Sequence, residues 1–447
     1  MAAGWTIGEQ SFGRIEQDVS RRKTRGIVDL LLILAVIALM SLSGFALEFF
    51  GVPYNSAGGS IISKIHPATY LICLAFGLAV IANRNPVVYA LGLLLRCLGS
   101  TFLLMGCVLL WVFISRYKPD YTASFLIDTL MATALFFMLF ADAGARTRLN
   151  VARVVHAIMI FNCMLSIVEG LSGWRLFPFI LSGHDQTWEY RATALLGHPL
   201  IGALVTGVYA VIVMTVKDVR GLGERWRGPI VLLCLVAMPF IGSRTSFTVV
   251  YATGAAVIGL KALRFLRGEA VSVRKLLVLL VLIPLVVCGV AGLVHMGLFD
   301  NFVGRFMHDK GSAESRVQVF GLFDDFTWRD LIVGQSNAVL DMNVRLHGLN
   351  EGIENSWVGL VVRYGLVMSA VMLFGMVGWF ADMLRVAGRG AVLPLAFVLL
   401  IISTTVGISG KTSMLSIPAV VILALLARTP DDDLSLTDSD VDRKSVV

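Results

Sequence analysis

Three arginines are expected at the outer membrane–water boundary, two beside long apolar runs and one in the outer loop 298–353. They are Arg191, Arg244 and Arg316. The planar guanidinium group binds phosphate oxygens through two parallel hydrogen bonds and keeps its charge at every physiological pH. Three such side chains around one site predict the binding of a lipid diphosphate. For each arginine alone, the alternative is an anchor whose side chain reaches the membrane surface.

A carboxylate in the same region could act as the general base that a group transfer also needs. Glu354 precedes Asn355 at the start of an apolar run, and Arg363 lies two turns further on. A carboxylate at a membrane edge is partly desolvated, which raises its pKa and makes it a better general base. Glu354 is therefore the candidate base, with Asp324 and Asp325 in reserve. The further candidates for substrate binding are Asn355, Arg363, His198 and His347.

The composition indicates whether the chain is a soluble protein or a membrane protein. The chain has 447 residues, of which 57% are hydrophobic and only 15% charged, and its mean hydropathy is +0.81. A soluble chain carries about 25% charged residues. A soluble enzyme, a disordered protein and a disulfide scaffold are therefore excluded. The six cysteines lie singly inside apolar runs, without a CxxC pair, so the sequence predicts no metal site and no cofactor.

Apolar runs that approach the length of a membrane span recur along the chain. A spanning helix needs about 20 mostly apolar residues. The runs are 27–50, 66–82, 91–115, 124–141, 151–171, 192–215, 229–242, 245–263, 276–297, 355–379, 391–408 and 412–427. The sequence therefore predicts an all-α polytopic membrane protein with about 12 transmembrane helices.

The basic residues give the orientation of these runs. With the N-terminus inside, most of the 37 Lys and Arg residues fall in cytoplasmic segments, as the positive-inside rule requires. Both termini are then cytoplasmic, and the net charge of +7 reports topology and not nucleic-acid binding. The expected divisions are a cytoplasmic segment 1–26, helices one to nine in 27–297, a large outer loop 298–353, helices ten to twelve in 354–427, and a disordered acidic tail 428–447.

Two further expectations concern the outer side of the membrane. Within the outer loop, the segment Ser315–Trp328 has the spacing of an amphipathic helix on the membrane surface. Glu169 stands near the outer end of the run 151–171. A carboxylate there is costly without a partner, and we expect it to pair with an outer arginine.

The order of the motifs resembles that of the O-antigen ligase and Wzy-type polysaccharide polymerase superfamily. The resemblance covers the fifth to tenth expected helices and the outer loop. The matching positions are Arg191 with Gly197 and Pro199, Ser243 with Arg244, Ser315 with Arg316, and Glu354 with Asn355, Trp357 and Gly365. Ligases of this superfamily usually begin the last motif with His. The acidic residue here is more similar to the exopolysaccharide polymerases.

The resemblance implies a metal-independent glycosyltransferase of GT-C-like architecture in the bacterial inner membrane. The donor would be a glycan on undecaprenyl diphosphate, and a hydroxyl of the glycan acceptor would attack its anomeric carbon. Arg191, Arg244 and Arg316 would stabilise the departing diphosphate, and Glu354 would accept the hydroxyl proton. Besides the lipid bilayer, other polysaccharide assembly proteins are expected partners.

Three other functions stay open at this point. If His347 serves as the base, the chain resembles an O-antigen ligase, which transfers the glycan to the lipid A core. Twelve helices with both termini inside are also typical of secondary transporters, although no internal repeat relates the two halves. The third alternative is a structural scaffold in a polysaccharide assembly complex.

Overall fold

The structure is a computed structural model of the chain. It describes residues 24–268 except 57, 182–183 and 186–190, position 295, and residues 317–428 except 325 and 350–351. The expected ninth helix, 276–297, lies outside these residues apart from position 295. Arg316, Asp325 and almost all of the two terminal segments also lie outside them.

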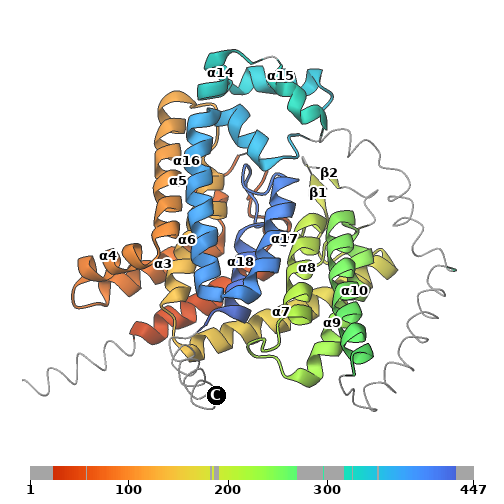
Figure 1. Ribbon diagram of the computed structural model, residues 1–447. Coiled ribbons are helices and arrows are strands. Elements are labelled where there is room, and N and C mark those ends of the chain that lie inside the picture. Colours follow the sequence, from red (N-terminus) through yellow and green to blue (C-terminus); the bar gives the residue numbers. More distant parts are fainter. Residues whose placement is uncertain are drawn as a thin grey trace, which may run out of the picture.

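The described part is almost entirely helical and forms an upright bundle with a helical cap (Figure 1). The helices in chain order are Thr24–Ser41, α2 (Gly44–Phe49), η1 (Ile62–Lys64), α3 (Pro67–Ile81), α4 (Pro86–Arg96), α5 (Leu98–Tyr117), η2 (Leu126–Met131), α6 (Ala132–Ala141), α7 (Ala145–Ser172), α8 (Pro199–Thr215), α9 (Glu224–Ile241), α10 (Arg244–Leu266), η3 (Val319–Phe323), α14 (Trp328–Val333), α15 (Asn337–Leu346), α16 (Ser356–Ala387), η4 (Arg389–Ala391), α17 (Val392–Ser403) and α18 (Ser416–Leu426). The strands β1 (Ile180–Leu181) and β2 (His184–Asp185) form a short antiparallel hairpin.

Five of the described helices are long and apolar enough to cross a membrane: Thr24–Ser41, α5, α7, α10 and α16. The other apolar helices are shorter, and several expected spans are interrupted or end early. The chain is therefore a helical protein with the long apolar helices of a membrane-embedded one. Fewer of its described helices have the full spanning length than the twelve apolar runs predicted.

The run expected as the third span is divided into two helices. α4 and α5 are separated at Cys97, whose backbone angles are not helical. α4 consequently projects sideways from the bundle (Figure 1). α5 packs along α16 through glycines, since a β-carbon at Gly99 would lie 1.9 Å from the carbonyl oxygen of Gly378. Small residues at such a contact let two membrane helices approach closely.

Two helices form the centre of the bundle. α8 and α18 are buried on nearly every side, and their sequences are apolar all round. A helix with no polar face is stable only where other helices surround it. α8 packs against α9, α10 and α18, and α18 also packs against α7. The helices that carry the expected site residues are therefore arranged around a fixed core.

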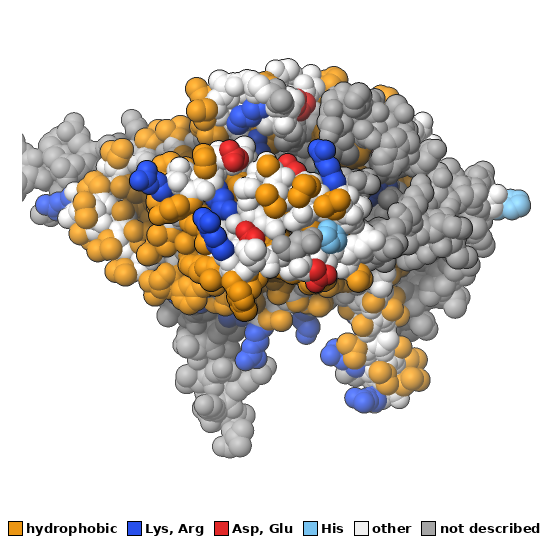
Figure 2. Space-filling view, turned by 90° about the horizontal axis from the view of Figure 1, so that it is seen from above, with side chains coloured by type: hydrophobic (Ala, Val, Ile, Leu, Met, Phe, Trp, Pro, Cys, Tyr) orange, Lys and Arg blue, Asp and Glu red, His pale blue; other side chains and the backbone are white. Residues whose placement is uncertain are grey.

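A small helical cap covers one end of the bundle. η3 and α15 pack around an apolar cluster of their own, which includes Val319, Leu322 and Leu340 together with Val358 and Val362 of α16, and α14 packs against α16. We call this end of the bundle the capped end. Charged side chains gather on its surface, bordered by hydrophobic side chains (Figure 2). The capped end is therefore the polar face of a largely apolar molecule.

The amphipathic helix predicted over 315–328 is wrong for the described part of that range. The short helix η3 ends at Phe323, and Thr327 starts a separate helix, α14. The hydroxyl of Thr327 accepts from the N–H of Asp330 and donates to its carboxylate at 2.7 Å. This capping box fixes a helix start at Trp328, so the chain turns where a continuous helix was expected.

The last two expected spans, 391–408 and 412–427, are both shorter than predicted. α17 ends at Ser403 and α18 begins at Ser416. We call the non-helical residues 404–415 between them the crossover segment. Its hydroxyl groups bond to backbone atoms, since Thr405 donates to the carbonyl of Ile401 at 2.9 Å and Thr412 to that of Gly407 at 2.8 Å. Polar side chains thus stabilise irregular backbone between two apolar helices.

Candidate functional site

The structure brings Arg191 and the Ser243–Arg244 turn together. The N–H of Ala192 donates to the carbonyl of Phe240 at 2.9 Å, which joins the segment before α8 to the end of α9. A β-carbon at Gly242 would lie 2.7 Å from Cγ of Arg191. The stem of Arg191 therefore crosses the α9–α10 turn, two residues before Arg244. The two half-buried arginines come from different motifs and meet at one place.

The turn between α9 and α10 adds a helix N-terminus to these two charges. Ser243 caps α10, with its hydroxyl accepting from the N–H of Ser246 at 3.4 Å, and Arg244 is the first residue of the helix. Unpaired N–H groups give a helix N-terminus a partial positive charge. Arg244 at this N-terminus and the stem of Arg191 against the preceding turn bring two arginines to one helix start, a combination that suits a phosphate or diphosphate group.

Glu169 of α7 holds the segment that carries Arg191. Its buried carboxylate accepts from the N–H groups of Leu176 at 3.0 Å, Thr193 at 2.9 Å and Ala194 at 2.8 Å. Ala194 has a φ of 44°, a left-handed conformation that costs energy in a residue with a side chain. Within the described residues, Glu169 bonds to backbone N–H groups and not to the outer arginine expected from the sequence.

His198 lies at the start of α8 and acts there as a helix cap. Its Nδ1 accepts from the N–H of Leu200 at 3.1 Å, and Pro199 occupies the first helical position. The ring packs against Phe179 at 5.6 Å and Phe45 at 6.4 Å between centroids. The structure therefore assigns this predicted substrate-binding residue a capping contact close to the arginine pair.

Glu354 and Asn355 lie at the entry of α16, on the capped end. Asn355 caps this helix, and its Oδ1 accepts from the N–H groups of Trp357 at 3.0 Å and Val358 at 3.1 Å. The preceding residue, Glu354, is half-buried. Helix capping thus explains the presence of Asn355 in the motif. The helix-capping contacts are made by Asn355 and not by Glu354.

Arg363 lies two turns below Glu354 and faces the crossover segment. Its guanidinium donates to the carbonyl of Gly359 at 3.3 Å. A β-carbon at Gly359 would lie 2.8 Å from the hydroxyl oxygen of Ser409 and 3.0 Å from the guanidinium of Arg363. Arg363 is therefore half-buried beside the crossover segment and does not reach the arginine pair through any contact among the described residues.

The cap is tied to the same stretch of α16. α16 is kinked at Gly365, whose φ is 77°, and a β-carbon there would lie 2.0 Å from the carbonyl oxygen of Ile332 in α14. Lys118 donates to the carbonyl oxygens of Gly334 at 2.6 Å and Gln335 at 2.8 Å. These contacts hold the cap against α16 beside Arg363. The sequence showed Lys118 only as one more outer charge.

His347 lies on the cap, at the end of α15. Its Nδ1 is 3.0 Å from the carbonyl oxygen of Asn343, and a β-carbon at Gly321 would lie 3.2 Å from its ring. Asp324 is the residue that ends η3. His347 and Asp324 therefore belong to the packing of the cap, while Arg316 and Asp325 lie outside the described residues.

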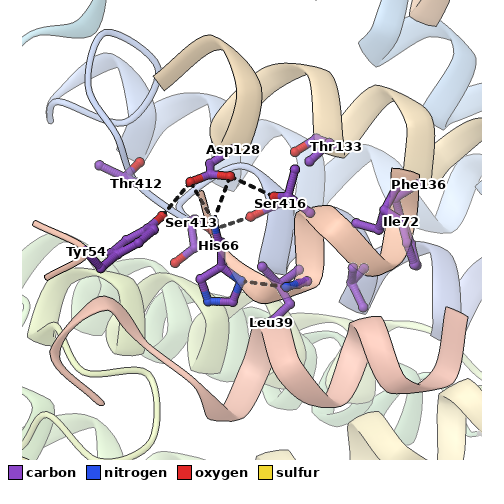
Figure 3. A pocket seen from close by; sticks show the side chains of 14 residues that line it. Leu39, Tyr54, His66, Ile72, Asp128, Thr133, Phe136, Thr412, Ser413 and Ser416 are labelled. Carbon is purple, nitrogen blue, oxygen red and sulfur yellow. Dashed lines mark hydrogen bonds between the residues drawn. The ribbon is translucent and has the colours of Figure 1, made fainter. Parts of the chain in front are cut away.

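The sequence reasoning missed a second polar group, around Asp128. This buried carboxylate of η2 accepts from Tyr54 at 2.8 Å, Thr69 at 2.7 Å and the N–H of His66 at 3.1 Å (Figure 3). Lys411 lies over the ring of Tyr54, 3.2 Å from its centroid, and donates to its carbonyl oxygen at 2.9 Å. The available signal was Asp128 itself, a carboxylate within the apolar run 124–141.

Comparison with known proteins gives no further guide to these residues. No family model, no curated protein and no solved structure matches the chain. The geometry therefore carries the functional argument. It offers Arg191 packed against the turn that carries Arg244, and a carboxylate, Glu354, at the entry of α16.

Proposed function

We propose that the chain is a polysaccharide polymerase of the Wzy type in the bacterial inner membrane. It would transfer glycan repeat units from undecaprenyl diphosphate to a growing chain on the outer face. In this proposal the capped end faces the periplasm, both termini are cytoplasmic, and the chain crosses the membrane twelve times in a GT-C-like architecture. Its substrates are the lipid-linked donor and the glycan acceptor.

The observation that carries the proposal is the meeting of Arg191 with the Ser243–Arg244 turn. The two motifs are far apart in the sequence, yet the stem of Arg191 lies against Gly242. A random pair of snorkelling anchors has no reason to converge on one helix N-terminus. Two arginines carried to one turn are what binding of a diphosphate requires, because its two phosphate groups carry several charges that need partners.

The reaction that we assign to these residues is a displacement at the anomeric carbon. The acceptor hydroxyl oxygen forms the new bond to that carbon, and the bond to the diphosphate oxygen breaks. The electron pair leaves with the diphosphate, where Arg191, Arg244 and Arg316 stabilise the increased charge. Glu354 takes the hydroxyl proton. The arginines thereby do the work that a metal ion does in other transferases, and no cofactor is needed.

The test is the size of the polymer made by a producing strain in which Arg244 is changed to Ala. We expect loss of long chains, with single repeat units remaining. Arg244→Lys keeps the positive charge but loses the planar guanidinium group that donates two parallel hydrogen bonds, and it should give partial function. Arg116→Ala is the matched control, because Arg116 is an exposed arginine in the last turn of α5. Wild-type polymer length in the Arg244→Ala strain contradicts the proposal.

The same experiment separates the alternatives. Full-length polymer that accumulates on its lipid carrier, unattached to the lipid A core, indicates a ligase. Loss of all polymer together with retention of repeat units on the cytoplasmic side indicates a transporter.

A further inference from the structure

A small, partly open cavity lies beside Asp128, apart from the arginine pair. Its volume of about 30 Å³ is enough for a water molecule or a small ion. The wall is built from segments distant in the sequence, namely the helix Thr24–Ser41, the loop that carries Tyr54, the first turns of α3, η2 with α6, and the crossover segment with α18 (Figure 3). Such a convergence does not arise from one local motif.

The hydroxyl groups in the wall direct their hydrogens away from the cavity. Thr133 donates to the carbonyl of Thr129 at 2.7 Å, Thr412 to that of Gly407 at 2.8 Å, and Ser416 to that of Ser413 at 3.4 Å. A hydroxyl has one hydrogen and two lone pairs. With the hydrogens used on backbone carbonyls, the three oxygens offer lone pairs, and Asp128 adds a carboxylate. The wall therefore adds several oxygen acceptors to a lining that is mostly apolar.

Irregular backbone surrounds the cavity on two sides. Asp128 lies in η2, a π-helical turn, and the crossover segment separates α17 from α18. Single π-helical turns occur frequently at functional sites. Interrupted helices at membrane depth expose backbone carbonyls that coordinate cations. A carboxylate within a membrane helix is costly and is retained for a function.

The charge of Asp128 is not matched by a direct cationic partner among the described residues. His66 is close, but its Nδ1 accepts from the N–H of Ala68 at 3.1 Å, and its Nε2 faces the carbonyl of Leu42. The ring is therefore neutral. Lys411 contacts the ring and the carbonyl of Tyr54, so the tyrosine stands between its ammonium group and Asp128.

We propose that this cavity binds one monovalent cation of the size of sodium. One carboxylate with neutral oxygen ligands balances a single positive charge. A divalent ion would require more carboxylates, and the part of the chain that the structure describes holds no group of three acidic, His or Cys side chains for a metal. The cavity volume of about 30 Å³ admits an ion but not its full hydration shell.

The test measures thermal unfolding of the purified full-length protein in detergent, with sodium chloride replaced stepwise by choline chloride at constant ionic strength. Binding to the folded state alone raises the midpoint with ligand concentration. We expect a saturable rise of about 1–4 °C with sodium and a smaller one with potassium. A midpoint that does not change with the sodium concentration overturns the proposal and indicates a cavity that holds only water. Equal shifts with sodium and potassium contradict the size argument.

Two variants locate the effect. Asp128→Asn removes the charge and should abolish the sodium-dependent rise, while Asp382→Asn, the matched control, should retain it. Asp382 is a buried aspartate of α16 that bonds to Ser100 and Arg385, outside the cavity wall. If Asp128→Asn does not fold, Ser416→Ala decides, because loss of one ligand should raise the half-saturating sodium concentration several-fold. An unchanged value there overturns the proposal, as does a retained rise in Asp128→Asn. The readout does not depend on polymerase activity.

Discussion

The stem of Arg191 lies directly on Gly242, so closely that a β-carbon at position 242 would be 2.7 Å from its Cγ. Gly242 also has a φ of 73°, in the left-handed region that glycine adopts without cost. Two properties of glycine are therefore used at once, its small size and its backbone freedom. The contact makes the position of one predicted catalytic motif dependent on the other.

Gly242→Ala should displace Arg191 and shorten the polymer. The added methyl group clashes with the arginine stem, and the left-handed backbone costs about 1–2 kcal/mol in alanine. Gly259→Ala, in the following helix α10, is the control, since Gly259 is exposed and a β-carbon there meets nothing within 4 Å. Chain-length analysis by gel in both strains measures the effect. Equal polymer length in the two variants would show that the position of Arg191 is unimportant.

Glu169→Ala should release the segment before α8. It leaves the buried N–H groups of Leu176, Thr193 and Ala194 without their acceptor, at a cost of about 1–3 kcal/mol for each unpaired group. The thermal midpoint of the purified Glu169→Ala variant should fall. The midpoint of Glu169→Gln, which keeps one oxygen acceptor, should fall less. Glu224→Ala, at an exposed glutamate in the first turn of α9, is the control. A wild-type midpoint in Glu169→Ala would refute the anchoring role.

Glu354→Gln should abolish polymerisation without loss of protein from the membrane. Glutamine has nearly the same shape but cannot accept the hydroxyl proton as a base. Asp341→Asn, at an exposed carboxylate of the cap, should keep activity. Immunoblotting of membranes and polymer sizing together make the measurement. Wild-type chain length in Glu354→Gln would remove Glu354 from the mechanism and turn attention to Asp324 and Asp325.

Lys411 should give the folded protein a dependence on alkaline pH. Burial lowers the pKa of Lys411 from its usual 10.5 to about 8, so the folded state binds this proton more weakly than the unfolded state. Stability therefore rises as the pH increases from about 8 to 10.5, because the folded state is relieved of a buried ammonium group. Below pH 8 both states are protonated and the cost is fully present.

The variant Lys411→Met isolates this contribution. Thermal midpoints are compared between pH 8 and pH 10 for wild type, Lys411→Met and the control Lys217→Met. Lys217 is exposed just after the C-terminal end of α8. The difference between Lys411→Met and wild type should shrink or reverse as the pH rises. The control should follow wild type throughout. A constant difference across the range would mean that Lys411 keeps its ordinary pKa.

The helical character of the chain was predictable from its apolar runs, because burial of apolar surface decides where such helices form. Their ends were less predictable. The break at Cys97 and the early end of α17 depend on tertiary contacts, such as Gly99 against Gly378 and the hydroxyl of Ser356 on the carbonyl of Thr405. A hydropathy pattern contains no information on such contacts between segments distant in the chain.

The candidate site was predictable in part. The arginine motifs were visible as residue types, and their spacing suggested one side of the membrane, but the contact between Arg191 and Gly242 required the fold. Asn355 and His198 were predicted to bind substrate, and both make helix-capping contacts that a sequence pattern does not distinguish from ligand contacts. Asp128 was missed because its partners Tyr54, His66 and Thr69 come from another part of the chain.

The most direct measurement uses the purified protein in lipid vesicles with a repeat unit linked to undecaprenyl diphosphate. Product length and released undecaprenyl diphosphate are followed together, with a chelator present. The account predicts that wild type makes longer chains and releases one lipid diphosphate for each unit added, and that Arg244→Ala does neither while Arg116→Ala does both. Absence of chain growth by wild type, or undiminished growth by Arg244→Ala, would contradict it.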